Sequence, residues 1–224
     1  WDDVSLINDK IVYCSISAFG QDGPLSKRGA YDHVVQGMTG IMTITGTKET
    51  GPTKVGAPYI DYATGLNAAF AITAALHETK KDKKAIRLDV SMMDTSLLLM
   101  ANLVTEHLNS GWIPTPMGNE AQSGSPSSGM YNTKTDPILL AANNDHQFFA
   151  LCNALNTISV FDKEKWELET YRKNNKEKLR EELQRIFITQ SAEFLENLLN
   201  DFNVPASKIR TLPEVLSEEQ FLER

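Results

Sequence analysis

The amino-acid sequence predicts an α/β protein that is divided into two units. Over residues 10–108, patterns typical of strands alternate with patterns typical of helices, as expected where helices cover a parallel sheet. From residue 109 the chain becomes rich in Gly, Pro, Ser and Asn over a stretch longer than most loops within a compact domain. A second group of strand and helix patterns follows. We therefore expect an α/β unit over residues 1–108, a linking segment over 109–125 and a small α+β unit over 126–224.

Four segments define the first unit. The run "KIVYCSISAFG" (10–20) is apolar, partly β-branched and ends in glycine, which predicts a buried strand. Residues 62–79 repeat apolar side chains at helical spacing and predict a mostly buried helix. The run "AIRLDVSM" (85–92) alternates as a short strand does, and "SMMDTSLLLMANLVTEHLN" (91–109) predicts one long helix that Ser91 caps, with an aspartate in its first turn. The apolar positions of the helix over 62–79 are Leu66, Ala69, Phe70, Thr73 and Leu76.

The second unit is expected to contain a strand and several amphipathic helices. The run "ILLAA" (138–142) has the apolar character of a strand, and Asn144 or Asp145 after it would cap a helix. The run "SAEFLENLLNDF" (191–202) predicts a further helix that Ser191 begins. The remaining predicted features are a charged helix over 174–188, a short helix begun by Pro213, and two inward helix faces: Phe148, Leu151, Cys152 and Leu155 on one helix, and Phe194, Leu195, Leu198 and Leu199 on the other.

The composition suits an ordinary globular protein and argues against several classes. Hydrophobic residues make up 41% and charged residues 23% of the chain, and no apolar run is long enough to span a bilayer. A net charge of −7 argues against a nucleic-acid partner, because binding phosphates requires a local excess of Lys and Arg. The lysine-rich run 80–84 is interpreted as a solvated loop. Cys14 and Cys152 lie in apolar patterns without metal-ligand spacing, which is typical of a reducing compartment.

One aspartate stands at the head of an apolar helix. The segment "KVGAPYIDYATGLNAAFAITAALHE" (54–78) places Asp61 just after a turn of small residues. A carboxylate in that position can cap the helix, or it can act as a nucleophile that a bulky substrate approaches past the small residues. The residues alone favour the cap, and they favour packing over catalysis for Tyr31. The sequence contains no zinc pattern, P-loop or GxGxxG motif, so we expect no metal site, and the scattered histidines do not indicate a Ser/His/Asp hydrolase.

Several ordered runs resemble a known family. "IVYCSISAFGQDGPLSKRGAYDHVVQGMTGIMTITG", "KVGAPYIDYATGLNAAFAITAALHE" and "IRLDVSMMDTSLLLM" resemble the central part of class III CoA-transferases, the family of formyl-CoA transferase and the carnitine CoA-transferases. "GNEAQSGSPSSGMYNTKTDPILLAANNDHQFFALCNAL" and "FLENLLNDFNVPASKIRTLPEV" resemble the small domain of that family, in the same order. The resemblance implies a Rossmann-like large-domain segment followed by a small α+β domain. It also implies that both ends of a longer protein are absent here, and that the intact protein is an interlocked homodimer. Because the cysteines indicate a reducing compartment, we expect the protein in the cytoplasm.

The resemblance further implies a covalent mechanism at Asp61. In the family the matching carboxylate attacks an acyl-CoA thioester, which gives a mixed anhydride and CoA thiolate, and the acceptor acid then exchanges in through an aspartyl-CoA thioester. The implied substrates are an acyl-CoA and a small carboxylic acid, with no tightly bound cofactor. Each step forms an oxyanion, which the family stabilises with a glycine-rich loop of the small domain. The segment around Gly124 lies at that place, although it lacks the run of glycines that some members have.

The same resemblance assigns residues beside the nucleophile. Tyr31 matches an active-site tyrosine of the transferases, whereas the related α-methylacyl-CoA racemases have "GHD" where this chain has "AYD". Because a tyrosine is a poor general base at neutral pH, transfer is favoured over racemisation. We expect His33 to project from a different helix face than residue 31, and Lys27 and Arg28 to contact CoA weakly. A racemase on the same fold and a non-catalytic binding module remain the alternatives.

Overall fold

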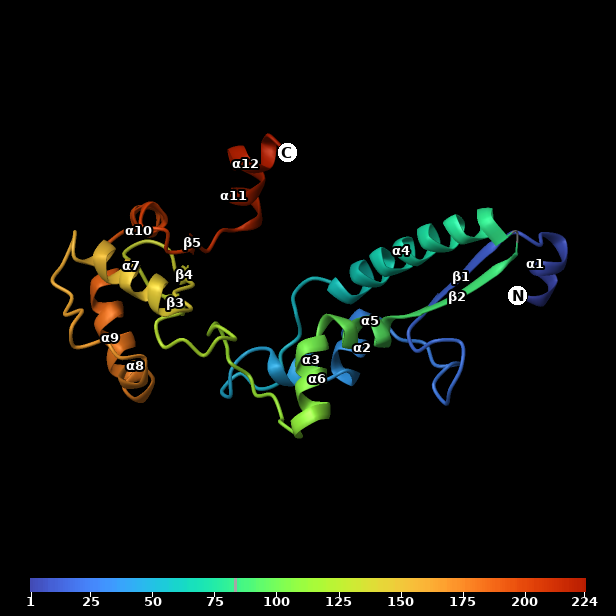
Figure 1. Cartoon of the computed structure of the whole chain (residues 1–224), viewed down its shortest axis with the longest axis horizontal. Helices are drawn as coiled ribbons and strands as arrows, with labels where there is room; N and C mark the ends of the chain where they lie inside the picture. Colours follow the sequence, from blue (N-terminus) through green and yellow to red (C-terminus); the bar gives the residue numbers. More distant parts are fainter. Residues whose placement is uncertain (83) are drawn as a thin grey trace. The chain divides into compact units, whose positions relative to one another are not determined.

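The computed structural model describes residues 1–82 and 84–224, which form two compact units, Trp1–Gly118 and Asn119–Arg224 (Figure 1). The boundary falls within the segment 109–125. Lys83, in the lysine-rich run expected as a loop, lies outside the described residues, and the helix before it continues through Asp82, further than predicted. No helix within the described ranges is both long and apolar enough to cross a membrane.

The first unit is built around a pair of parallel strands. Their register runs from Val12 opposite Ile86 to Ser17 opposite Ser91. Figure 1 shows the long helix α4 running along both strands, which it joins as a crossover connection. The elements in chain order are α1 (Asp2–Ile7), β1 (Val12–Ser17), α2 (Asp32–Met38), α3 (Ile41–Ile44), α4 (Tyr59–Asp82), β2 (Ile86–Ser91), α5 (Met92–Leu99) and α6 (Ala101–Ser110).

The packed face of α4 differs from the predicted one. All five apolar positions predicted for this helix are exposed, including Leu66 at 74% and Phe70 at 76%. A stripe of mostly small residues is buried instead, and it lets the helix approach the strands and α5 closely. The prediction of a mostly buried helix was therefore wrong, because hydrophobicity does not decide which face packs when small side chains allow the closer contact. The buried stripe consists of Ile60, Thr64, Ala68, Ala75 and Thr79.

The helix predicted over 91–109 is broken into two. Ser91 caps α5 as predicted: its Oγ accepts a hydrogen bond from the Asp94 amide at 2.9 Å and donates to the Asp94 carboxylate at 2.6 Å. The chain leaves helical geometry at Met100 (φ −106°, ψ 22°), and α6 starts at the next residue. Gly111 ends α6 in the left-handed conformation with φ 71°, where glycine has no steric penalty.

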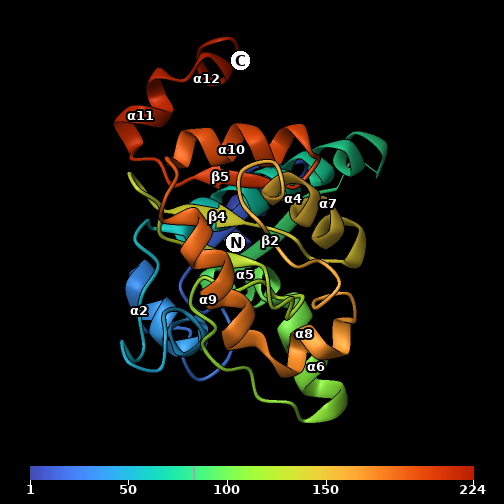
Figure 2. The same ribbon diagram turned by 90° about the vertical axis from the view of Figure 1, so that its left-hand side faces the viewer.

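The second unit packs helices against a three-stranded antiparallel sheet in the order β3-β4-β5. Figure 2 shows α10 running beside β5. The large side chains buried here include Tyr131, Phe148, Trp166 and Phe187, which form one hydrophobic core. The elements are β3 (Gly129–Tyr131), β4 (Ile138–Leu140), α7 (Asp145–Leu155), α8 (Glu169–Asn174), α9 (Lys176–Phe187), α10 (Ala192–Asp201), β5 (Ala206–Lys208), α11 (Leu212–Ser217) and α12 (Glu219–Leu222).

Local caps begin α7 and α10 as the sequence indicates. The side chain of Asn144 accepts a hydrogen bond from the Gln147 amide and thereby caps α7. Ser191 caps α10 in the same way. All four apolar side chains predicted to face inward on α7 are buried, whereas on α10 Phe194 is 43% exposed, contrary to the prediction.

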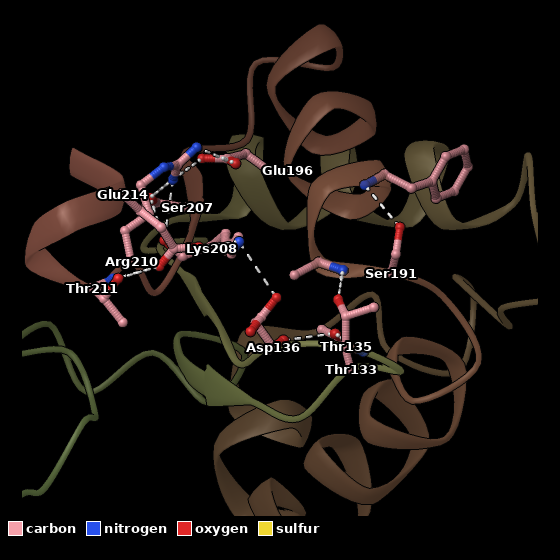
Figure 3. Close-up of polar contacts among 12 residues, drawn as sticks. Thr133, Thr135, Asp136, Ser191, Glu196, Ser207, Lys208, Arg210, Thr211 and Glu214 are labelled. Carbon is pink, nitrogen blue, oxygen red and sulfur yellow. Dashed lines mark hydrogen bonds and ion pairs between the residues drawn. The ribbon is translucent and has the colours of Figure 1, made fainter. Parts of the chain in front are cut away.

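Ion pairs connect β5, α10 and α11. Figure 3 shows Lys208 between Asp136 and Glu214, with Nζ–O distances of 3.4 and 2.7 Å. Arg210 places both terminal nitrogens 2.9 Å from the carboxylate oxygens of Glu196. The hydrogen bond from Lys208, followed by those from the cap residue Thr211, lowers the pKa of Glu214 to about 2. This network fixes the start of α11.

Candidate active site

A cavity of about 270 Å³ in the first unit contains the side chain of Asp61, which the family resemblance predicts to be the nucleophile. It lies where the start of α2 meets the loop before α4 and the first turn of α4. Asp61 and Tyr31 both line it, so the structure brings together two of the predicted site residues. The full lining is Tyr31, Asp32, His33, Lys54, Gly56, Ala57, Pro58 and Asp61.

Asp61 is not the cap of its own helix. It is the third residue of α4, and its side chain is exposed. Within residues 1–82 and 84–224, no group donates a hydrogen bond to its carboxylate; only its backbone N–H is engaged. The positive end of the helix dipole favours negative charge in this first turn. The capping interpretation is therefore wrong, and the structure leaves an ionisable oxygen pair open to the cavity.

The cap of α4 comes instead from Asp32, the first residue of α2. Its Oδ2 accepts hydrogen bonds from the backbone amides of Ile60 at 2.8 Å and Asp61 at 3.4 Å. Its Oδ1 accepts a hydrogen bond from Gln36 Nε2 at 2.5 Å, and Gln36 Oε1 accepts one from the Val55 amide at 2.8 Å. Asp32 and Gln36 are both buried. This pair thus fixes both the first turn of α4 and the loop that precedes it.

Sequence reasoning missed Asp32 and Gln36, although both carried a signal. They stand four residues apart in α2, so they share one helix face, and a buried polar pair on one face needs donors from elsewhere. The four free amides at the start of α4 are such donors. Asp32 lies 29 residues before Asp61 in the chain. No local sequence pattern could therefore have paired Asp32 with the amide of Asp61.

Tyr31 and His33 form an aromatic pair at the cavity. Their rings stack with centroids 6.2 Å apart and planes only 4° apart. Tyr31 does not belong to the helix: it occupies the N-cap position with extended backbone (φ −108°, ψ 167°), and it is 77% exposed. Helical spacing therefore does not apply between residues 31 and 33. The expectation that His33 points away from Tyr31 was wrong for this reason.

Lys54 is the basic side chain of the cavity. It is exposed, and its Nζ donates long hydrogen bonds to the carbonyl oxygens of Val55 at 3.3 Å and Gly56 at 3.4 Å. The adjacent Gly56 has open space where a Cβ would be. The loop therefore presents a cation and little steric bulk in front of Asp61. No pattern in the sequence distinguishes this lysine from the other exposed ones.

The other predicted site residues lie elsewhere. Lys27 and Arg28 are exposed on the loop between β1 and α2, with the Arg28 guanidinium 5.9 Å from the Phe19 ring centroid, and neither lines the cavity. Gly124 belongs to the second unit, in a turn with φ 66° and open space at its Cβ position. Their roles toward a substrate stay predictions. Among residues 1–82 and 84–224, no cluster of His, Cys, Asp and Glu has a geometry that suits a metal ion.

The chain is similar to proteins of one family along its whole length. The model of CoA-transferase family III matches residues 1–224. The succinate–glutarate CoA-transferase of Agrobacterium fabrum is 31% identical over 220 residues, covering 98% of this chain and 55% of that protein. The human succinyl-CoA:glutarate CoA-transferase is 29% identical over 222 residues, covering 99% of this chain and 50% of that protein.

A solved structure gives the same result for the fold. A CaiB/BaiF family protein from Brucella suis superposes with a TM-score of 0.87 at 30% identity, covering 100% of this chain and 59% of that one. The predicted α/β fold class is thereby confirmed. The chain spans about half the length of the curated relatives it matches. The resemblance drawn from the ordered runs is confirmed as well: the chain belongs to CoA-transferase family III.

Proposed function

We propose that the protein to which this chain belongs transfers CoA between an acyl-CoA and a carboxylic acid, with Asp61 as the nucleophile. One observation carries the proposal. The Asp61 carboxylate opens into a cavity and accepts no hydrogen bond from the described residues, whereas Asp32 accepts the first-turn amides of Ile60 and Asp61. An accessible carboxylate that is held on a helix is suited to nucleophilic attack. Membership of the family and the names of the relatives support transfer of CoA.

The reaction balances with the groups that the substrates bring. A carboxylate oxygen of Asp61 attacks the thioester carbon, the C–S bond breaks, and CoA leaves as thiolate from a mixed anhydride. The thiolate then attacks the aspartyl carbon, which releases the donor acid and leaves an aspartyl-CoA thioester. The acceptor carboxylate attacks this thioester, the C–S bond breaks, and CoA thiolate leaves from a second mixed anhydride. The thiolate then attacks the acceptor acyl carbon, which gives the new acyl-CoA and releases the Asp61 carboxylate. The donor thioester and the product thioester have similar energies, so no oxidant, reductant or nucleotide is consumed.

Other predicted residues have roles within this proposal. The tetrahedral oxyanions need preorganised N–H donors, for which we propose the segment around Gly124. Lys27 and Arg28 would contact the phosphates of CoA, because exposed cationic side chains on a loop can form charge-assisted hydrogen bonds with phosphate groups. The Tyr31 hydroxyl would hydrogen-bond to the reacting acyl group. The acceptor is proposed to be a short dicarboxylic acid, since the names of the relatives from A. fabrum and human contain glutarate and that from Acetobacter aceti contains oxalate.

The test is to trap the covalent intermediate. The intact protein is incubated with succinyl-CoA and hydroxylamine, and peptides are analysed by mass spectrometry for a hydroxamate at Asp61. We expect modification at Asp61 in the wild type, and loss of turnover by about 10⁴-fold or more in Asp61→Asn. Asp22→Asn, which removes a carboxylate from the exposed loop after β1, is the control and should keep normal turnover. Unmodified Asp61 in an active enzyme would overturn the covalent mechanism.

One observation supports a second candidate function. His33 lines the same cavity as Asp61, and an imidazole can exchange a proton near neutral pH. Racemisation of a 2-methylacyl-CoA needs two acid/base groups on opposite sides of the α-carbon, and Asp61 and His33 could supply them. Incubation with a chiral 2-methylacyl-CoA in deuterated water distinguishes the two reactions. Rapid deuterium uptake at the α-carbon without an acceptor acid, abolished by His33→Gln, would identify a racemase.

A further inference from the structure

Two side chains of opposite charge in the cavity, Asp61 and Lys54, can still form hydrogen bonds with a ligand. In the third charged side chain, Asp32, both carboxylate oxygens accept hydrogen bonds from amide groups of the protein. Within residues 1–82 and 84–224, the Asp61 carboxylate accepts no hydrogen bond, and Lys54 Nζ donates only to two carbonyl oxygens at 3.3 and 3.4 Å. Across the described part of the chain, no carboxylate lies within 4.0 Å of the Lys54 ammonium. The cavity thus contains a nucleophilic carboxylate and a cation that are not paired with each other.

The separation of these charges decides what kind of ligand fits. A Lys54–Asp61 ion pair would lower the nucleophilicity of the carboxylate, but the lysine is held over the loop carbonyls instead. An ammonium with three donors retains hydrogen-bonding capacity for an anion of the ligand. A ligand that presents an acyl carbon to Asp61 and a negative group to Lys54 would satisfy both side chains. The acyl part of a dicarboxylic acid has these two functional groups at its two ends.

The size of the cavity agrees with a short acid. Its volume of about 270 Å³ is below the about 300–1,000 Å³ that is typical of sites for drug-sized ligands. The small side chains of Gly56 and Ala57 line it between Lys54 and Asp61 in the chain, so they leave room for a few methylene groups along the loop. A long hydrocarbon chain would lie against charged and polar groups here. The lining therefore favours a compact, charged acyl group.

We propose that Lys54 is the specificity residue that binds the distal carboxylate of a dicarboxylic acid whose other carboxyl group reacts at Asp61. This inference rests on the proposed function, because it assumes that the acyl group is attached at Asp61. Lys54 is a determinant of substrate choice and does not take part in bond making. It discriminates by charge: a monocarboxylic acid of the same length leaves the lysine without an anionic partner and loses that interaction.

The experiment compares two acids that differ in one carboxyl group. Transfer from acetyl-CoA to glutarate and to valerate is measured with the intact wild-type protein and with Lys54→Met and Lys54→Arg. We expect Lys54→Met to lower kcat/KM for glutarate by at least about tenfold, mainly through KM, and to change the value for valerate less than twofold, since a charge-assisted hydrogen bond is worth about 1.5–3 kcal/mol. Lys54→Arg should keep most of the glutarate activity. Lys48→Met removes another exposed lysine from the same loop region, outside the cavity, and should leave both acids unaffected.

A binding measurement separates this inference from the proposed function. Glutarate binding is followed by ligand-observed NMR for the wild type and for Lys54→Met, without acyl-CoA. Glutarate binding that depends on Lys54 in a protein that transfers CoA to neither acid would support the subsite and refute the function. Active transfer with equal losses for glutarate and valerate in Lys54→Met, or with no loss for either, would refute the subsite and leave the function intact.

Discussion

Replacing Asp32 by alanine should destabilise the first unit by about 3–4 kcal/mol. The substitution removes the acceptor for two buried donors, the Ile60 amide at 2.8 Å and Gln36 Nε2 at 2.5 Å, and for the weaker contact of the Asp61 amide at 3.4 Å. A buried donor left unsatisfied costs about 1–3 kcal/mol, and loss of a helix cap about 1 kcal/mol. The two strong bonds at about 1.5 kcal/mol each, with a fraction for the weak one, give the stated range.

Asparagine at the same position should cost less, about 1–2 kcal/mol, and the reason lies in the geometry of Gln36. In Asp32→Asn the new side chain would keep one oxygen for the Ile60 amide but would turn its NH₂ group toward Gln36 Nε2, donor against donor. Gln36 cannot rotate its amide to relieve this contact without losing the hydrogen bond from the Val55 amide at 2.8 Å. The order of stability is therefore wild type, then Asp32→Asn, then Asp32→Ala.

Hydrogen exchange followed by mass spectrometry of peptides tests the predicted loss of stability at the start of α4. A local measurement is needed because the two units need not unfold in one step. Peptides that cover 59–66 should exchange at least about tenfold faster in Asp32→Ala, while peptides from α7 in the second unit keep the wild-type rate. Asp22→Ala, on an exposed loop, serves as the control. Unchanged exchange over 59–66, with an unfolding free energy within about 0.5 kcal/mol of the wild type, would refute the assignment of Asp32 as the cap of α4.

Three further predictions concern other parts of the chain. Burial raises the pKa of the Cys152 thiol to about 11, so at pH 8 a thiol reagent should modify the partly exposed Cys14 first, and modification of Cys152 before unfolding would contradict the packing of α7. Gly46→Ala should lower the free energy of unfolding, measured by urea titration, by at least about 2 kcal/mol, because the φ of Gly46 is 89° and an added Cβ would lie 2.5 and 2.7 Å from two threonine hydroxyls. The control Gly51→Ala, at a φ of 66° with open space around the added Cβ, should cost about 1 kcal/mol, and equal costs for the two variants would exclude the clash. The pKa of Glu214 is lowered from 4.5 to about 2, so its stabilisation of α11 is complete above pH 4.5 and is lost as the pH falls toward 2. NMR titration of the carboxyl group measures this pKa, and an unshifted midpoint would show that the ion pair is absent in solution.

The features that were predicted correctly from the sequence are those whose cause is local. The caps formed by Ser91, Asn144 and Ser191 each bond to an amide three residues ahead, so a short window of sequence contains both partners. The strands follow from β-branched and apolar runs for the same reason. The inward face of α7 was predicted because one stripe of large apolar side chains coincides with the packed side.

The face of α4 that packs was mispredicted because it depends on residues far apart in the chain. The packed face of α4 is chosen by the fit of small side chains such as Ala68 and Ala75 against other elements, while the larger Leu66 and Phe70 remain exposed. The break at Met100 is not marked by a glycine or a proline in the sequence. In both cases, propensity within the helix carries no information about its surroundings.

The arrangement at the start of α4 suggests why two aspartates are used where one would make a cap. A single carboxylate that accepts the first-turn amides has its lone pairs directed at the protein and its negative charge delocalised into those bonds, which makes it a poor nucleophile. Here Asp32 in α2 accepts hydrogen bonds from the amides of Ile60 and Asp61, while no donor among the described residues occupies the carboxylate oxygens of Asp61. The same helix end then favours negative charge at Asp61 without binding it. Under the proposed mechanism, Asp32→Asn should lower kcat for transfer more than it changes the KM for acyl-CoA, because the Asp32 oxygens bond to protein donors and the substitution therefore acts mainly on the position of Asp61.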